Sequence, residues 1–174
     1  MLRLSYTRNF FILICLSTLG CYDANSSTVA TSQPNQPQFS VNDECKISFD
    51  PKKREFKLAS KLTVSPELPR VRCIIRINTS NAQKQFRLVP LALKGEVKKA
   101  PGTVAISSIL ISEQQQPTSV SIKYTSSTKF DLTNQIPKTN YTTKEKSVLA
   151  INLVLMTTKG ELEVTDMKFA LQEK

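Results

Sequence analysis

Beyond residue 43, apolar and polar residues alternate with a period of two, and this pattern restricts the chain to β-structure. The alternation is clearest in residues 55–64, 70–77 and 120–124. Successive side chains of a strand point to opposite faces of a sheet, so each segment predicts a half-buried strand. Residues 147–156 are apolar on both faces, which predicts a central strand covered on each side. At residues 165–166 the alternation slips by one position, which predicts a β-bulge.

Turn residues separate about eight such segments, and no segment has the periodicity of a convincing helix. Asp50-Pro51-Lys52-Lys53 predicts one turn and residues 157–160 another. Pro90 removes a backbone donor and is expected to disturb the strand that begins near residue 86. Residues 134–146 are polar and predict a loop. We therefore expect an all-β domain, an antiparallel β-sandwich of about eight strands.

Four cysteines have different expected roles. Cys15 lies within an apolar segment near the N-terminus, and Cys21 follows that segment. This leaves Cys45 and Cys73 as an even pair, which in an exported protein indicates one disulfide. Each of the two shares a strand face with apolar neighbours, as a buried bridge between strands requires. The alternative is two separate buried thiols.

The N-terminus has the layout of a secretory signal peptide. Arg3 and Arg8 are basic, and residues 10–16 (FFILICL) are apolar but too few to span a membrane. The small residue before the cysteine in Gly20-Cys21 resembles the lipobox of bacterial lipoproteins, although Thr18 stands where leucine is usual. That resemblance implies a Cys21 thiol carrying diacylglycerol, and Tyr22 implies the outer membrane or cell surface. The alternative is ordinary cleavage near Gly20 or Ala24 and free secretion.

The remaining sequence divides into a tether and a domain. Residues 22–43 are rich in Ser, Thr, Asn, Gln and Pro, a composition typical of flexible linkers. We expect a signal peptide over 1–20, a flexible polar tether over 21–43 and a β-sandwich domain over 44–174.

Two segments of the domain resemble secreted β-sandwich domains of unknown function found in fungi and bacteria. They are residues 70–78 (RVRCIIRIN) and 149–171 (LAINLVLMTTKGELEVTDMKFAL). The similarity covers most of residues 44–171. It implies the fold and an exported location, and it implies no activity.

The chain contains no histidine and no tryptophan, which excludes imidazole metal sites and Ser-His-Asp or Cys-His catalysis. Glu161, Glu163 and Asp166 could supply the carboxylate pair of a glycosidase, but charges on a strand usually mark its solvated side. Ser147 with Lys146 or Lys144 lacks the strained turn of a nucleophile elbow. We expect no catalytic residues, no metal and no cofactor.

Basic residues are the best indication of a partner, since the formal net charge is +10. If the strands that carry them are neighbours, their outward faces form an anion-binding patch for anionic polysaccharide, lipid headgroups or an acidic protein. The alternative is a basic surface that only confers solubility. Nucleic acid is disfavoured because exposed aromatic residues do not alternate with the basic ones. The patch would consist of Lys52, Lys53, Arg54, Lys57, Arg70, Arg72 and Arg76.

Together these features predict a non-enzymatic exported envelope protein. It would be lipid-anchored to the membrane and act as a binding or structural accessory module with a basic surface. The alternative function is a freely secreted lectin-like or matrix-binding β-sandwich.

Overall fold

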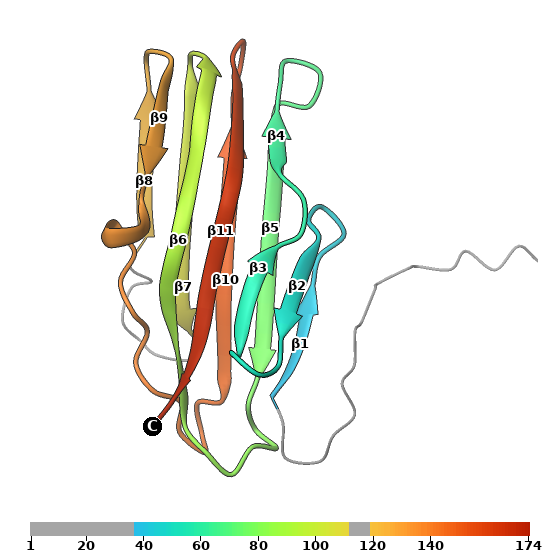
Figure 1. The fold of residues 1–174 in the computed structure, drawn as a ribbon, viewed down its shortest axis with the longest axis vertical. Coiled ribbons are helices and arrows are strands. Elements are labelled where there is room, and N and C mark those ends of the chain that lie inside the picture. The colour runs from blue at the N-terminus through green and yellow to red at the C-terminus, as the bar shows by residue number, and fades with distance from the viewer. Residues whose placement is uncertain (1–36, 112–118) are drawn as a thin grey trace, which may run out of the picture.

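The computed structural model describes residues 37–111 and 119–174, which form two antiparallel β-sheets packed face to face (Figure 1). Sheet A contains, in spatial order, β1 (Gln38–Val41), β5 (Arg70–Asn78), β10 (Val148–Met156), β7 (Gly102–Leu110) and β8 (Ser119–Tyr124). Sheet B contains β2 (Ile47–Asp50), β3 (Glu55–Leu58), β11 (Glu161–Glu173), β6 (Phe86–Lys99) and β9 (Thr128–Asp131), and β4 (Leu62–Val64) also pairs with β11. A single turn of 3₁₀-helix, η1 (Thr133–Gln135), follows β9.

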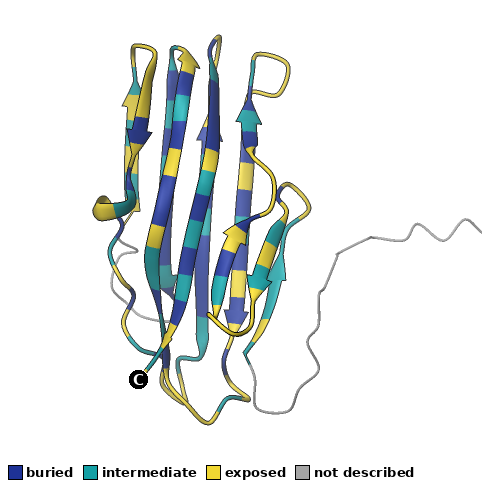
Figure 2. Ribbon diagram, in the orientation of Figure 1, coloured by how far each residue is buried: buried dark blue, intermediate teal, exposed yellow. Residues whose placement is uncertain are grey.

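The alternation in the sequence places one set of side chains between the sheets. Along β5, Cys73, Ile75 and Ile77 are fully buried, whereas Arg70, Arg72 and Arg76 on the other face of the strand are exposed, and this alternation is visible in Figure 2. Phe56 and Phe169 supply the largest buried side chains of sheet B. The buried residues of both sheets form one apolar cluster, whose removal from water is the main favourable contribution to folding.

The all-β antiparallel sandwich expected from the sequence is confirmed, with three differences of detail. β1 lies within the range 21–43 expected to be a tether, so ordered structure begins before residue 44. The segment 55–64 forms two strands, β3 and β4, which both pair with β11. β6 continues through Pro90, where a register shift lies opposite Phe169. The expected bulge is present between Val164 and Asp166.

The expected disulfide between Cys45 and Cys73 is also confirmed, with a Cα–Cα distance of 5.3 Å. Cys45 lies in the connection before β2 rather than within a strand. The bridge therefore fastens this connection to the edge of β5 beyond the end of β1. Here side chains replace a strand: Asn42 Oδ1 accepts from the Ile74 N–H at 2.6 Å, and Glu44 Oε2 accepts from the Arg72 N–H at 2.5 Å.

The polar segment 134–146 also completes a strand edge. The Phe86 N–H donates to Thr142 Oγ1, and the Leu88 N–H donates to Thr139 Oγ1, both at 2.9 Å. Both threonines are buried. The segment thus satisfies the backbone of β6 where β9 no longer pairs with it, and it is more tightly built than its composition indicates. Within the described residues, no helix has the length and apolar character needed to cross a membrane.

Candidate anion-binding face

The charged residues are distributed unequally between the two sheets. The five strands of sheet A contain four cations and no carboxylate, a formal charge of +4. The strands of sheet B contain seven cations and eight carboxylates, a formal charge of −1. Because field strength depends on local charge rather than on net charge, sheet A is the positive side of the sandwich. Its cations are Arg70, Arg72, Arg76 and Lys123.

Three of the seven cations in the strands of sheet B, Lys94, Lys98 and Lys168, pair with carboxylates of the same sheet. Lys168 pairs with Glu55 at 2.8 Å, and Lys94 pairs with Asp131 at 3.2 Å. In the described part of the chain, no ion pair involves any of the four cations of sheet A. Among the described residues, Lys57, Lys99 and Lys129 of sheet B also have no ion pair, so sheet A differs from sheet B mainly because its strands contain no carboxylate to offset their cations.

Glu163, one of the carboxylates considered for catalysis, is held by two lysines. Its Oε2 atom lies 2.9 Å from Lys98 Nζ and 3.0 Å from Lys61 Nζ, and Lys98 also contacts Glu161 at 3.2 Å. The hydrogen bond from Lys98, followed by that from Lys61, holds the pKa of the Glu163 carboxyl below its usual value. An ionised carboxylate fixed in this way stabilises the strand pairing and is a poor general acid, because that role requires a raised pKa.

We call the outward surface of sheet A the arginine face and define it by Arg70, Arg72 and Arg76 of β5 and Lys123 of β8. An antiparallel strand advances about 3.4 Å along its axis per residue, so the three arginines extend along about 20 Å of β5. Lys123 lies across three strand spacings from Arg70, a Cα separation of about 14 Å. The four cations therefore border a strip of β10 and β7.

The strip between these cations is uncharged and contains no aromatic side chain. Its outward residues on β10 and β7 are Val148, Ala150, Asn152, Val154, Met156, Thr103, Ala105, Ser107 and Ile109. Asn152 and Thr103 supply hydrogen-bonding groups on this strip, whereas Ser107 and Ala150 are buried. The face thus offers charge and polar groups over an extended surface, without a ring on which a neutral sugar could stack.

Arg72 is the most firmly held cation of the face. Its Nε–H donates to Asn152 Oδ1 on β10 at 2.9 Å, which fixes the plane of the guanidinium group and leaves its terminal nitrogens to the solvent side. Glu44 lines a hollow together with Arg70 and Arg72, and its Oε2 atom accepts a hydrogen bond from the Arg72 backbone N–H. Arg76 lies four residues beyond Arg72 along β5, and in the pairing register it is flanked by Ser40 of β1 and Ala150 of β10.

The structure does not bring the seven predicted patch residues together. Arg70, Arg72 and Arg76 lie on sheet A, whereas Lys57 lies on the outward side of β3 in sheet B. The remaining three residues, Lys52, Lys53 and Arg54, form the turn between β2 and β3. Asp50 Oδ1 accepts hydrogen bonds from the backbone N–H groups of Lys52 and Lys53. Both bonds lower the pKa of the Asp50 carboxyl, and the bond from Lys53 has the larger effect.

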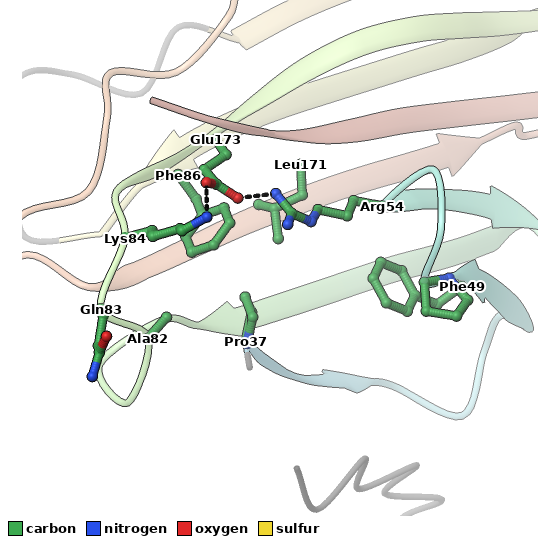
Figure 3. Close-up of a pocket in the computed structure, with 10 residues that line it drawn as sticks. Pro37, Phe49, Arg54, Ala82, Gln83, Lys84, Phe86, Leu171 and Glu173 are labelled. Carbon is green, nitrogen blue, oxygen red and sulfur yellow. Dashed lines mark hydrogen bonds and ion pairs between the residues drawn. The ribbon is translucent and has the colours of Figure 1, made fainter. Parts of the chain in front are cut away.

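Arg54 belongs to a separate hollow of about 280 Å³ at the end of the sandwich near the C-terminus (Figure 3). Glu173 pairs with both Arg54 and Lys84 in this hollow. The Arg54 guanidinium carbon also lies 5.8 Å from the centre of the Phe86 ring. The ion pair with Lys84, and then that with Arg54, holds the pKa of the Glu173 carboxyl below its usual value. Because the two cations already share a carboxylate, we regard the arginine face as the stronger anion site.

Lys123 was missed by the sequence analysis because residues 119–124 contain only one cation and gave no sign of their position beside β7. Only the sheet order, with β8 paired to β7 and β7 paired to β10, places Lys123 on the same face as the arginines.

Comparisons with known proteins do not assign a family. No family model matches the sequence, and no curated protein matches it. Among solved structures, the chain has a distant likeness to the carbohydrate-binding module TmCBM61 in complex with β-1,4-galactotriose. The identity is 10% and the TM-score 0.38, and the match covers 83% of this chain and 92% of that one. A likeness this distant carries no argument about function.

Proposed function

We propose that this protein is a non-enzymatic, exported binding module of the cell envelope whose arginine face binds an anionic polysaccharide. The observation that carries the proposal is the segregation of charge: the strands of one sheet contain four cations and no carboxylate, and the strands of the other have a formal charge of −1. A surface needed only for solubility would gain nothing from this segregation, since interspersed charges serve that purpose equally well.

The layout of the face favours a linear polyanion as the ligand. Three arginines in one row extend along about 20 Å, a length that suits a chain of repeated acidic groups better than a single small anion. Guanidinium groups bind carboxylate and sulfate-like oxygens through paired hydrogen bonds, and Arg72 is already oriented by Asn152. Because the contacts are ionic and solvent-exposed, binding is expected to weaken strongly as salt concentration rises.

We further propose that Cys21 carries a lipid anchor, on the basis of the resemblance of Gly20-Cys21 to a lipobox. The described chain enters β1 at the end of the sandwich where the C-terminus lies, and Arg70 lies at the opposite end (Figure 1). The Cys45–Cys73 bridge is consistent with export, because disulfides persist in oxidising compartments.

Binding to polygalacturonate, measured by calorimetry with neutral dextran as the control polymer, tests the proposed function. Replacing the three arginines of β5 by glutamine should weaken binding by about threefold to 160-fold, since exposed ion pairs contribute about 0.2–1 kcal/mol each. The matched control replaces Lys57, Lys99 and Lys129 by glutamine. These three exposed lysines lie on sheet B and make no ion pair within the part of the chain that the structure describes. The control removes the same charge and should leave the affinity within about twofold.

Equal weakening by both triple variants would contradict the proposed site, because binding would then follow net charge alone. Binding to vesicles of anionic lipid in preference to polygalacturonate would contradict the proposed ligand. The lipid anchor has its own test: radiolabelled palmitate should be incorporated by the full chain and not by Cys21→Ala. A wild-type protein that takes up no label would be a freely secreted module instead.

A further inference from the structure

At the Arg70 end of the arginine face, one row of paired residues crosses four strands. Arg70 of β5 pairs with Met156 of β10, Met156 with Thr103 of β7, and Thr103 with Lys123 of β8. A hollow of about 420 Å³ lies over this row. We call it the Met156 hollow and define it by its lining residues: Pro69, Arg70, Pro101, Gly102, Thr103, Lys123, Met156, Thr157 and Thr158.

The Met156 hollow is built on a hydrogen-bonded frame that joins three loops. The N–H of Thr157, which is buried, donates to the Pro69 carbonyl at 2.9 Å, and its hydroxyl donates to the Pro101 carbonyl at 2.6 Å. The same hydroxyl accepts from the Gly160 N–H at 2.8 Å. A Cβ at Gly160 would lie 2.3 Å from the carbonyl oxygens of both Lys99 and Pro101, so only glycine allows this approach. The loops are therefore fixed relative to one another, and the hollow is formed before any ligand arrives.

The lining combines an apolar floor with a cation at each side. Met156 is 38% exposed, although most apolar side chains of this size in the domain are buried. Pro69 and Pro101 extend the apolar surface, Thr103 offers a hydroxyl group, and Arg70 and Lys123 flank the floor from opposite sides. In the described part of the chain neither cation has an ion pair. Small-molecule sites commonly have this composition, a mainly apolar surface with a few polar groups that fix orientation.

We propose that the Met156 hollow is a discrete binding site for a small organic acid with an apolar body, such as an aryl or acyl carboxylate or sulfonate. The apolar body lies on Met156 between the two prolines, and the acidic group pairs with Lys123 or Arg70. A thioether floor suits ligands of variable shape, because methionine is flexible and polarisable. The hollow occupies one end of the arginine face and shares Arg70, Thr103, Lys123 and Met156 with it, so a small dye probe is used to test the hollow separately from the polysaccharide.

Fluorescence titration with 1-anilinonaphthalene-8-sulfonate tests the proposal, with the uncharged N-phenyl-1-naphthylamine as the comparison probe. The sulfonate should bind the purified protein with a single site and more tightly than the neutral amine. Met156→Gln should weaken its binding roughly tenfold through the loss of apolar contact. Lys123→Gln should weaken it about fivefold through the loss of one exposed ion pair. Both side chains face solvent, so neither substitution should change the midpoint of thermal unfolding appreciably.

Two control variants separate this site from non-specific dye binding. Leu91→Gln removes another exposed apolar side chain, 40% exposed on β6 of sheet B, and should leave the dye affinity unchanged. Arg76→Gln removes a cation from the far end of the arginine face and should also leave it unchanged. The proposal is overturned if the neutral amine binds as tightly as the sulfonate, if Met156→Gln binds the dye like the wild type, or if Leu91→Gln weakens binding as much as Met156→Gln. A protein that binds the dye and not polygalacturonate would contradict the proposed function but would support the small-molecule site in the Met156 hollow.

Discussion

Reducing the Cys45–Cys73 disulfide should lower the free energy of unfolding by about 3.6 kcal/mol. The bridge joins residues 28 positions apart, and the chain-entropy relation gives this value at 25 °C for a loop of that length. The bridge also holds Asn42 and Glu44 against the unpaired edge of β5, where their side chains satisfy the backbone of Ile74 and Arg72. Loosening of these hydrogen bonds adds to the loss, so the entropic value is the lower expectation.

Equilibrium urea unfolding of the wild-type protein with and without dithiothreitol measures this difference. Comparing two redox states of one sequence avoids the cavity that alanine would leave at Cys73, which is fully buried. The double variant Cys45→Ala/Cys73→Ala is the control, and its unfolding curve should not respond to the reductant. A difference below about 1 kcal/mol would refute the argument that this bridge confines the unfolded chain. Two alkylatable thiols at these positions without reductant would refute the bridge itself.

Three further substitutions test individual parts of the fold. Because its lysine partners lower the pKa of the Glu163 carboxyl, Glu163 contributes stability that is present above the ordinary carboxyl pKa and is lost as pH falls through its folded-state pKa. Glu163→Gln should therefore flatten the acid limb of a plot of unfolding midpoint against pH, and an unchanged limb would argue against the role of this group. Thr142→Val removes the acceptor of the buried Phe86 N–H and should lower the free energy of unfolding in urea by about 1–3 kcal/mol. The control, Thr128→Val at an exposed position of β9, should lower it by less than about 0.5 kcal/mol. Gly160→Ala should destabilise the protein far more than Gly102→Ala. A Cβ at Gly160 would meet two carbonyl oxygens at 2.3 Å, whereas a Cβ at Gly102 would meet the movable side chain of Leu162 at 3.2 Å. Similar thermal unfolding midpoints for the two variants would contradict this expectation.

The sequence was sufficient to predict the fold class and the disulfide because both depend on local patterns. Alternation along β5 and the position of Cys73 within it require only the period of a strand. The extent of β1 and the tight packing of residues 134–146 could not be predicted in this way. Gln38–Val41 is only four residues long and is ordered by pairing with β5. Thr139 and Thr142 have a role only because β6 lies beside them.

The candidate site was predictable only in part, for a related reason. The three arginines of β5 share a face by their spacing alone, and the sequence analysis included them. Which other cations join them depends on sheet order, and here the expectation of a patch shared with Lys57 and the β2–β3 turn differed from the structure. β3 lies in sheet B, on the opposite side of the sandwich from β5, whereas Lys123 is brought onto the arginine face through β7 and β10.

The central claim is that one sheet of this sandwich binds an anionic polymer, and mapping the contact surface tests it most directly. Backbone amide shifts of the isotopically labelled protein would be followed by nuclear magnetic resonance during titration with short polygalacturonate chains. We predict shifts along β5, β10, β7 and β8, largest near Arg72 and Arg76, that are reversed by salt. Shifts centred on β3, β11 and β6, or spread evenly over both sheets, would contradict the claim.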